Sequence, residues 1–164
     1  MAITKVNNRS INRAAAQWRL SATQSSMDSG DFITDNWEQA DTDGFGALGS
    51  SMTESSGTFT FPSTGYWLVM WHGSCKASGN AVNSFGFEMR TTTDNSSYSS
   101  AATGSGSGAA DDYFANVACF HLFDVTSTTN CKCSMKYNSS ATGIYQADTD
   151  RSVNALTFIK LADT

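Results

Sequence analysis

A thiol, an imidazole and a carboxylate lie close together in the sequence, at Cys119, His121 and Asp124. A cysteine nucleophile, its base and an orienting acid require these three groups. Side chains two apart on a strand point to the same face, so the backbone would hold Cys119 and His121 side by side. Because no turn would aim one at the other, we expect no catalytic residues in this group.

Motifs of other enzyme classes do not occur in the sequence. There is no Gly-x-Ser-x-Gly turn, and the stretch "GSGSG" at 104–108 lacks the lysine of a phosphate-binding loop. We interpret 96–112, which is rich in Gly, Ser and Ala, as a low-complexity surface loop between strands. The chain is therefore predicted not to be an enzyme.

Two aspartates, Asp41 and Asp43, precede Gly44 in "DTDGFG". Carboxylates two apart in a turn can converge on calcium, which prefers oxygen ligands. The rest of a calcium-binding loop is absent, and in a solvated turn the same side chains would bond to the local backbone. We expect no metal and no cofactor, with calcium at Asp41 and Asp43 as the open alternative.

Trp37 lies in "NWEQAD", beside acidic and amide side chains. Such an aromatic ring, if exposed, could provide a platform for a sugar. The alternative, which we favour, is that Trp37 anchors a long loop to the core.

Four cysteines are present, and two of them, Cys131 and Cys133, alternate with Lys132 and Ser134. This alternation is typical of a strand with its cysteines on one face. A bond between neighbours on one face would distort the strand, and the start of the sequence lacks the apolar core of a secretory signal. We expect four buried, reduced thiols and no disulfide.

Two segments, 66–72 and 117–123, are apolar on both faces. A strand of an antiparallel sandwich normally shows one apolar face, so the second face needs a cover, and a second copy of the chain would provide it. The pattern leaves open which face of 66–72 is covered. The candidate interface residues are Tyr66, Leu68, Met70, Phe120 and Leu122.

The remaining segments also indicate short strands, and none has convincing helical periodicity. The strand after 117–123 is expected to form a hairpin with it through "TSTTN". A net charge of −5 argues against nucleic-acid binding, and no run of about 18 apolar residues indicates a membrane span. The pattern predicts an all-β, antiparallel sandwich or barrel.

The stretch "GTFTFPSTGYW" and the final "NALTFIKLA" resemble the tumour necrosis factor and complement-globular-head superfamily. The resemblance covers roughly residues 18 to 162 and implies a two-sheet jelly roll of about ten strands that forms homotrimers through one sheet. We therefore expect a jelly-roll domain at 18–164, preceded at 1–17 by an arm or a first edge strand. The matching positions are Gly57, Phe59, Pro62, Gly65 and Tyr66.

The short polar start and the body rich in Ser, Thr, Asn and Gly resemble virion proteins of marine tailed phages. This resemblance implies a trimeric capsid decoration or cement protein, assembled in the host cytoplasm and found in the virion. Lys5, Arg9 and Arg13 make the start locally basic, so we expect them to dock on the major capsid protein or another virion protein. The alternative is a receptor-binding head of a tail fibre, specific for a host glycan or protein.

Overall fold

The computed structural model describes residues 13–42, 44–77, 82–108, 113–140 and 142–164. These residues form twelve strands and contain no helix. Among them, therefore, there is no helix long and apolar enough to cross a membrane. The strands are β1 (Ala15–Leu20), β2 (Gln24–Met27), β3 (Trp37–Gln39), β4 (Thr53–Ser55), β5 (Thr58–Thr60), β6 (Gly65–Ala77), β7 (Val82–Thr92), β8 (Ser99–Gly108), β9 (Ala115–Val125), β10 (Lys132–Ser139), β11 (Gly143–Tyr145) and β12 (Ala155–Ala162).

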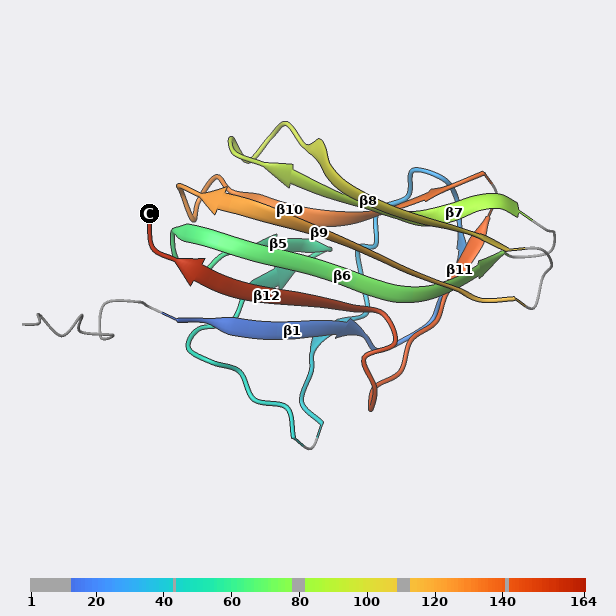
Figure 1. The fold of residues 1–164 in the computed structure, drawn as a ribbon, viewed down its shortest axis with the longest axis horizontal. Coiled ribbons are helices and arrows are strands. Elements are labelled where there is room, and N and C mark those ends of the chain that lie inside the picture. Colours follow the sequence, from blue (N-terminus) through green and yellow to red (C-terminus); the bar gives the residue numbers. More distant parts are fainter. Residues whose placement is uncertain (1–12, 43, 78–81, 109–112, 141) are drawn as a thin grey trace, which may run out of the picture.

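The strands form two antiparallel sheets that face each other (Figure 1). Sheet A runs β3-β1-β12-β6-β9, and β11 and β2 continue it at the far end of β6. Sheet B has the order β4-β5-β10-β7-β8. The predicted all-β, two-sheet jelly roll is confirmed. The total exceeds the expected ten, and five of the strands, β2, β3, β4, β5 and β11, have only three or four residues.

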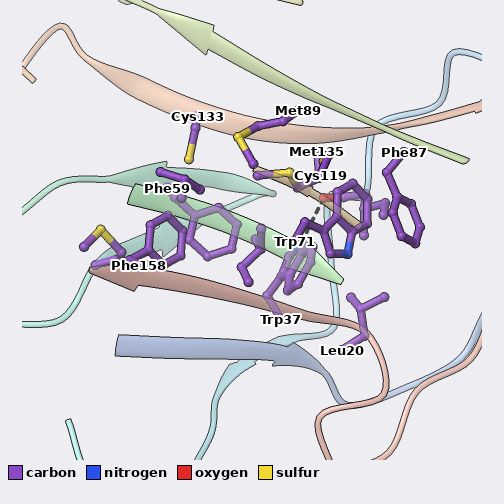
Figure 2. Packing of buried hydrophobic residues seen from close by; sticks show 14 of the residues in the cluster. Leu20, Trp37, Phe59, Trp71, Phe87, Met89, Cys119, Cys133, Met135 and Phe158 are labelled. Carbon is purple, nitrogen blue, oxygen red and sulfur yellow. Dashed lines mark hydrogen bonds between the residues drawn. The ribbon is translucent and has the colours of Figure 1, made fainter. Parts of the chain in front are cut away.

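The core lies between the two sheets and is rich in aromatic side chains (Figure 2). Trp67, Val69 and Trp71, which alternate along β6, are completely buried. Trp71 stacks across the sandwich on Phe87 of β7, with ring centroids 3.8 Å apart. This face of β6 therefore faces the core, and the other face points outward. Burying one such side chain contributes about 1.5–3 kcal/mol to the stability of the fold.

Residues 99–108 form β8, so the interpretation of this stretch as a loop was wrong. Its sequence alternates small inward residues with exposed Thr103, Ser105 and Ser107. A side chain on Gly104 would collide with the carbonyl oxygen of Ala118 in β9. Glycine is therefore needed because β8 of sheet B passes very close to the backbone of sheet A.

The predicted hairpin between β9 and β10 was also wrong. β9 pairs with β6 in sheet A, whereas β10 pairs with β5 and β7 in sheet B. The connection at 126–131 therefore crosses from one sheet to the other. Burial explains the crossing. Val125 and Cys131 lie at the two ends of the connection and are both fully buried, because each faces the shared core from its own sheet.

The turn between β5 and β6 packs against the end of β12. Gly65 has a φ of 136°, and a Cβ there would collide with the carbonyl oxygen of Ala162 and the side chain of Lys160. The buried Lys160 ammonium donates to Ser63 Oγ at 3.0 Å and pairs with Asp163. The glycine of the "PSTGY" motif thus leaves space for the Lys160 side chain, which connects this turn to the C-terminal residues.

The first strand begins at Ala15, inside the segment expected to precede the domain. Ala15 pairs with Ile159 of β12, and Trp18 pairs with Gln39 of β3. β1 therefore lies between two strands, rather than at the edge of the sheet, and takes in residues on both sides of the expected boundary at 17/18. Residues 1–12 lie outside the described residues.

Candidate subunit interface

The outer face of sheet A carries a group of apolar side chains on β6 and β9. Backbone pairing sets Leu68 beside Leu122 and Met70 beside Phe120. Phe120 is 73% exposed, Leu122 55% and Tyr66 41%, and Leu68 and Met70 are half-buried. All five candidate interface residues therefore point to the same side. We call this set, Tyr66, Leu68, Met70, Phe120 and Leu122, the apolar face.

The outer face of sheet B is polar. Its cross-strand rows read Thr58–Ser134–Arg90 and Lys136–Glu88–Thr103. The Glu88 carboxylate lies 3.5 Å from the Arg90 guanidinium and 4.0 Å from the Lys136 ammonium. The two outer faces of the sandwich therefore differ in kind, and only that of sheet A offers a large apolar surface among the described residues.

A depression lies on the outer face of sheet A, over β1 and β12. Its volume is about 240 Å³. Its lining, which sequence reasoning did not identify, includes Ala15, Gln17, Phe45, Gly46, Thr157 and Ile159. We call the depression that these six residues line the hole.

The polar groups of the hole bond to one another or to neighbouring residues. Gln17 Nε2 donates to Thr157 Oγ1 at 2.9 Å, and Gln17 Oε1 accepts from Ser152 Oγ at 2.7 Å. Both ends of the Gln17 amide are thus engaged. An apolar group could enter the hole without taking a partner from either of them.

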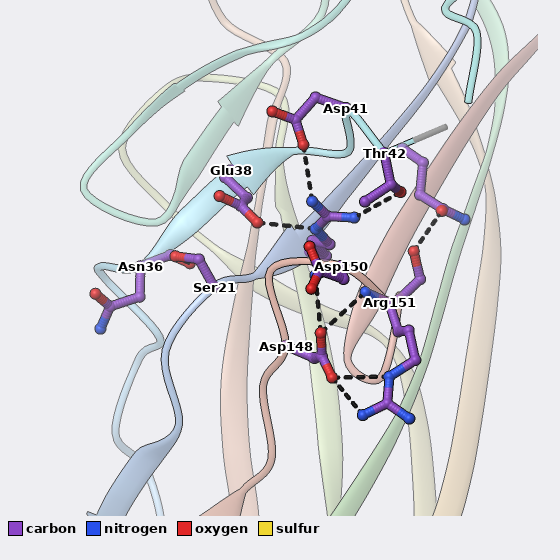
Figure 3. A network of polar contacts seen from close by, with 11 residues as sticks. Ser21, Asn36, Glu38, Asp41, Thr42, Asp148, Asp150 and Arg151 are labelled. Atoms are coloured by element: carbon purple, nitrogen blue, oxygen red, sulfur yellow. Dashed lines mark hydrogen bonds and ion pairs between the residues drawn. The ribbon is translucent and has the colours of Figure 1, made fainter. Parts of the chain in front are cut away.

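The loop that carries Phe45 and Gly46 is held to β1 at both ends. Ala15 and Leu48 exchange two backbone hydrogen bonds, of 2.8 and 3.0 Å. At the other end, the buried Arg19 guanidinium pairs with Glu38 and Asp41, each at 2.8 Å (Figure 3). These contacts keep the loop over the outer face of β1 and so shape the hole.

One of the two calcium candidates, Asp41, belongs to this ionic network. Asp41 Oδ1 accepts from Arg19, and Asp43 lies outside the described residues. In the described part of the chain, no three His, Cys, Asp or Glu residues gather as a metal site. Calcium binding at Asp41 and Asp43 stays a prediction.

The group Cys119, His121 and Asp124 does not converge. Cys119 is buried on the core side of β9 while Asp124 is exposed on the outer side. Burial raises the pKa of the Cys119 thiol to about 11, so it is protonated near neutral pH and is a poor nucleophile. Burial also lowers the pKa of His121.

The four cysteines are free and buried, as predicted. Trp37 is buried as well, and its indole nitrogen donates to the carbonyl oxygen of Ile33 at 3.0 Å. Its ring packs edge-on against Phe59, with centroids 5.3 Å apart. Trp37 is therefore a core anchor and not an exposed platform for a sugar.

No protein-family model matches the chain, and no curated protein matches it in sequence. Solved structures match its fold. The structure of Eiger TNF from S. frugiperda has a TM-score of 0.68 at 14% identity, over 93% of this chain and 95% of that one. Murine APRIL at pH 5.0 has a TM-score of 0.66 at 11% identity, over 91% and 99%. The chain therefore has the TNF-like jelly roll that its sequence indicated.

Proposed function

We propose that this TNF-like jelly roll is a non-enzymatic structural subunit that works as a homotrimer, with its apolar face covered by neighbouring copies. The observation that carries the proposal is the difference between the two outer faces. The outer face of sheet B carries hydroxyl and charged groups, of which Thr103 and Ser105 are exposed, whereas sheet A exposes Phe120, Leu122 and Tyr66. A contiguous exposed apolar patch of this kind usually marks an interaction site.

Covering this face would supply much of the association energy. Burying one large apolar side chain contributes about 1.5–3 kcal/mol, and a ring of three copies repeats each contact three times. The number three comes from the resemblance to the tumour necrosis factor superfamily. The fold, with the apolar residues gathered on one sheet, supports the same arrangement.

The setting that we propose is the outside of a phage capsid, where the trimer would act as a decoration or cement protein. Support comes from the Ser-, Thr-, Asn- and Gly-rich sequence and from Lys5, Arg9 and Arg13 at the start of a chain with net charge −5. Arg13 is exposed directly before β1. Basic groups there would guide encounter with an acidic capsid surface.

A receptor-binding head is the second candidate, and one observation favours it. Tyr113 and Phe114, just before β9, are exposed, and the Lys76 ammonium lies 5.4 Å from the centre of the Phe114 ring. Exposed aromatic rings beside a cation suit recognition of a host molecule. A reconstruction of the virus particle separates the two candidates, because a decoration protein follows the capsid lattice and a receptor-binding head lies on the tail.

The trimer is tested by charging the apolar face. Phe120→Asp and Leu122→Asp each place a carboxylate where the proposal buries an apolar group. Sedimentation at micromolar concentration should give three times the 17.5 kDa subunit mass for the unaltered chain and the monomer mass for the variants. Ser105→Asp, on the polar face of sheet B, is the matched control and should remain trimeric. A monomeric unaltered chain would refute the proposal.

A further inference from the structure

Two rows of paired residues run across the outer face of sheet A and connect the apolar face to the hole. Each row starts on β9, crosses β6 and β12, and ends on β1. The rows are Phe120–Met70–Thr157–Gln17 and Leu122–Leu68–Ile159–Ala15. The most exposed apolar side chain and the hole thus lie at opposite ends of the same row.

The hole has the size and chemistry to accept an aromatic ring. Its volume is about 240 Å³, and a dry cavity of about 150 Å³ holds benzene. Ala15, Phe45 and Ile159 provide apolar walls. The Gln17 amide has partners at both ends, in Thr157 and Ser152, so an entering ring need not displace either of these hydrogen bonds.

We propose that Phe120 of one subunit inserts into the hole of the next, which makes the interface a one-way contact between two different patches. The inference rests on the proposed self-association and names the contact that directs it. Phe120 of the same chain cannot fill the hole, because β6 lies between β9 and the nearest strand that lines it, β12. Two strand spacings, about 10 Å, separate Phe120 from Thr157.

The arrangement of the two patches determines how copies can assemble. A contact between two different patches closes into a ring when the rotation between neighbours allows it. Because the rows run across the strands, the symmetry axis would lie along the strands. A ring of three would contain three identical Phe120 contacts, and a two-fold pair would contain two.

A disulfide introduced between the two patches tests the contact. We would place Phe120→Cys and Thr157→Cys in one chain. The two positions are too far apart to bond within a chain, since disulfides need Cα atoms within about 7 Å. The native cysteines are buried, and burial raises the pKa of Cys75 to about 12, which slows their competing reactions. The matched control is Thr157→Cys with Ser105→Cys on the opposite face.

Mild oxidation followed by a non-reducing denaturing gel should give a covalent trimer for the first pair and none for the control pair. A covalent dimer as the largest product would overturn the three-fold ring in favour of a reciprocal pair. Absence of any cross-link, in a protein that still sediments as a trimer, would overturn the Phe120 contact and leave the proposed function standing. A monomer of the unaltered chain would overturn both.

A second variant keeps the test valid if Phe120→Cys weakens assembly. Thr157→Trp fills the hole while leaving Phe120 in place. The trimer association constant should fall about 10- to 100-fold per contact, the loss expected when one large apolar side chain stays in water. Phe120→Ala should add little to this loss, because both changes remove the same contact. Additive losses, or full assembly of Thr157→Trp, would overturn the proposal.

Discussion

At the scale of single residues, burial keeps the thiols in their protonated form. Burial raises the pKa of Cys119 to about 11 and that of Cys75 to about 12, from an ordinary value of 9.0. The folded chain therefore holds these protons at a pH where the unfolded chain releases them. The raised pKa values of the two thiols add their full contribution to the free energy of unfolding below pH 9. This contribution is lost as the pH rises toward 11 and 12.

We predict that the free energy of unfolding falls between pH 8 and pH 10. Each of the two thiols should account for up to about 1.4 kcal/mol at pH 10. Urea unfolding of Cys119→Ala should show a smaller fall than that of Val117→Ala, a control that removes a buried group without a proton from the same strand. Equal falls in the two variants would contradict the prediction.

The sequence identified the residues of the apolar face but not those of the hole. Tyr66, Leu68, Met70, Phe120 and Leu122 repeat every second position along two segments, so their common direction follows from strand geometry alone. The hole depends instead on where Phe45 and Gly46 lie over β1. Arg19 and Leu48 hold the loop of these two residues through contacts between distant segments, which no local pattern reveals.

At the scale of elements, β8 shows how a strand can form without large apolar side chains. Its glycines face inward, where they allow β9 to approach, and its hydroxyl residues face water. The small residues that indicated a loop are therefore the residues that allow β8 to pack closely against β9.

We predict that Gly104→Ala destabilises the fold. The added methyl group would collide with the carbonyl oxygen of Ala118, and overpacking of this kind costs about 1–3 kcal/mol. Ser105→Ala, the adjacent solvent-facing position, should stay within about 0.5 kcal/mol of the unaltered chain. Urea unfolding measures both, and equal stability of the two variants would show that β8 can move away from β9.

The other elements differ in how far the sequence could predict them. Alternation of apolar and polar residues correctly indicated β5, β7 and β10, and apolar runs indicated β6 and β9. The partner of β10 was missed, because a short connection fits both a hairpin and a crossing between sheets. The choice depends on which side each strand buries, and Val125 and Cys131 bury theirs in a shared core.

At the scale of the whole molecule, the proposed docking segment and the folded domain can be separated. Since β1 begins at Ala15, a deletion of residues 2–12 leaves every described strand intact. We predict that the truncated chain folds and forms trimers but binds the proposed capsid partner at least about tenfold more weakly, a loss of about 1.4 kcal/mol.

Sedimentation with purified capsids measures this loss, and neutralising Lys5 and Arg9 in the full chain provides the matched comparison. Normal binding by the truncated chain would place attachment elsewhere on the jelly roll. Loss of trimers would show that residues 2–12 contribute to assembly rather than to docking.

The pairing of β1 with β12 also fixes where the folded domain begins and ends. The two strands are antiparallel and Ala15 pairs with Ile159, so the start of the first strand lies beside the end of the last (Figure 1). A short linker could therefore join the two ends, and the chain could be reopened at another connection without altering either sheet. The jelly roll is, in this sense, suited to circular permutation, and peptides fused directly before β1 or directly after β12 would emerge at the same end of the sandwich.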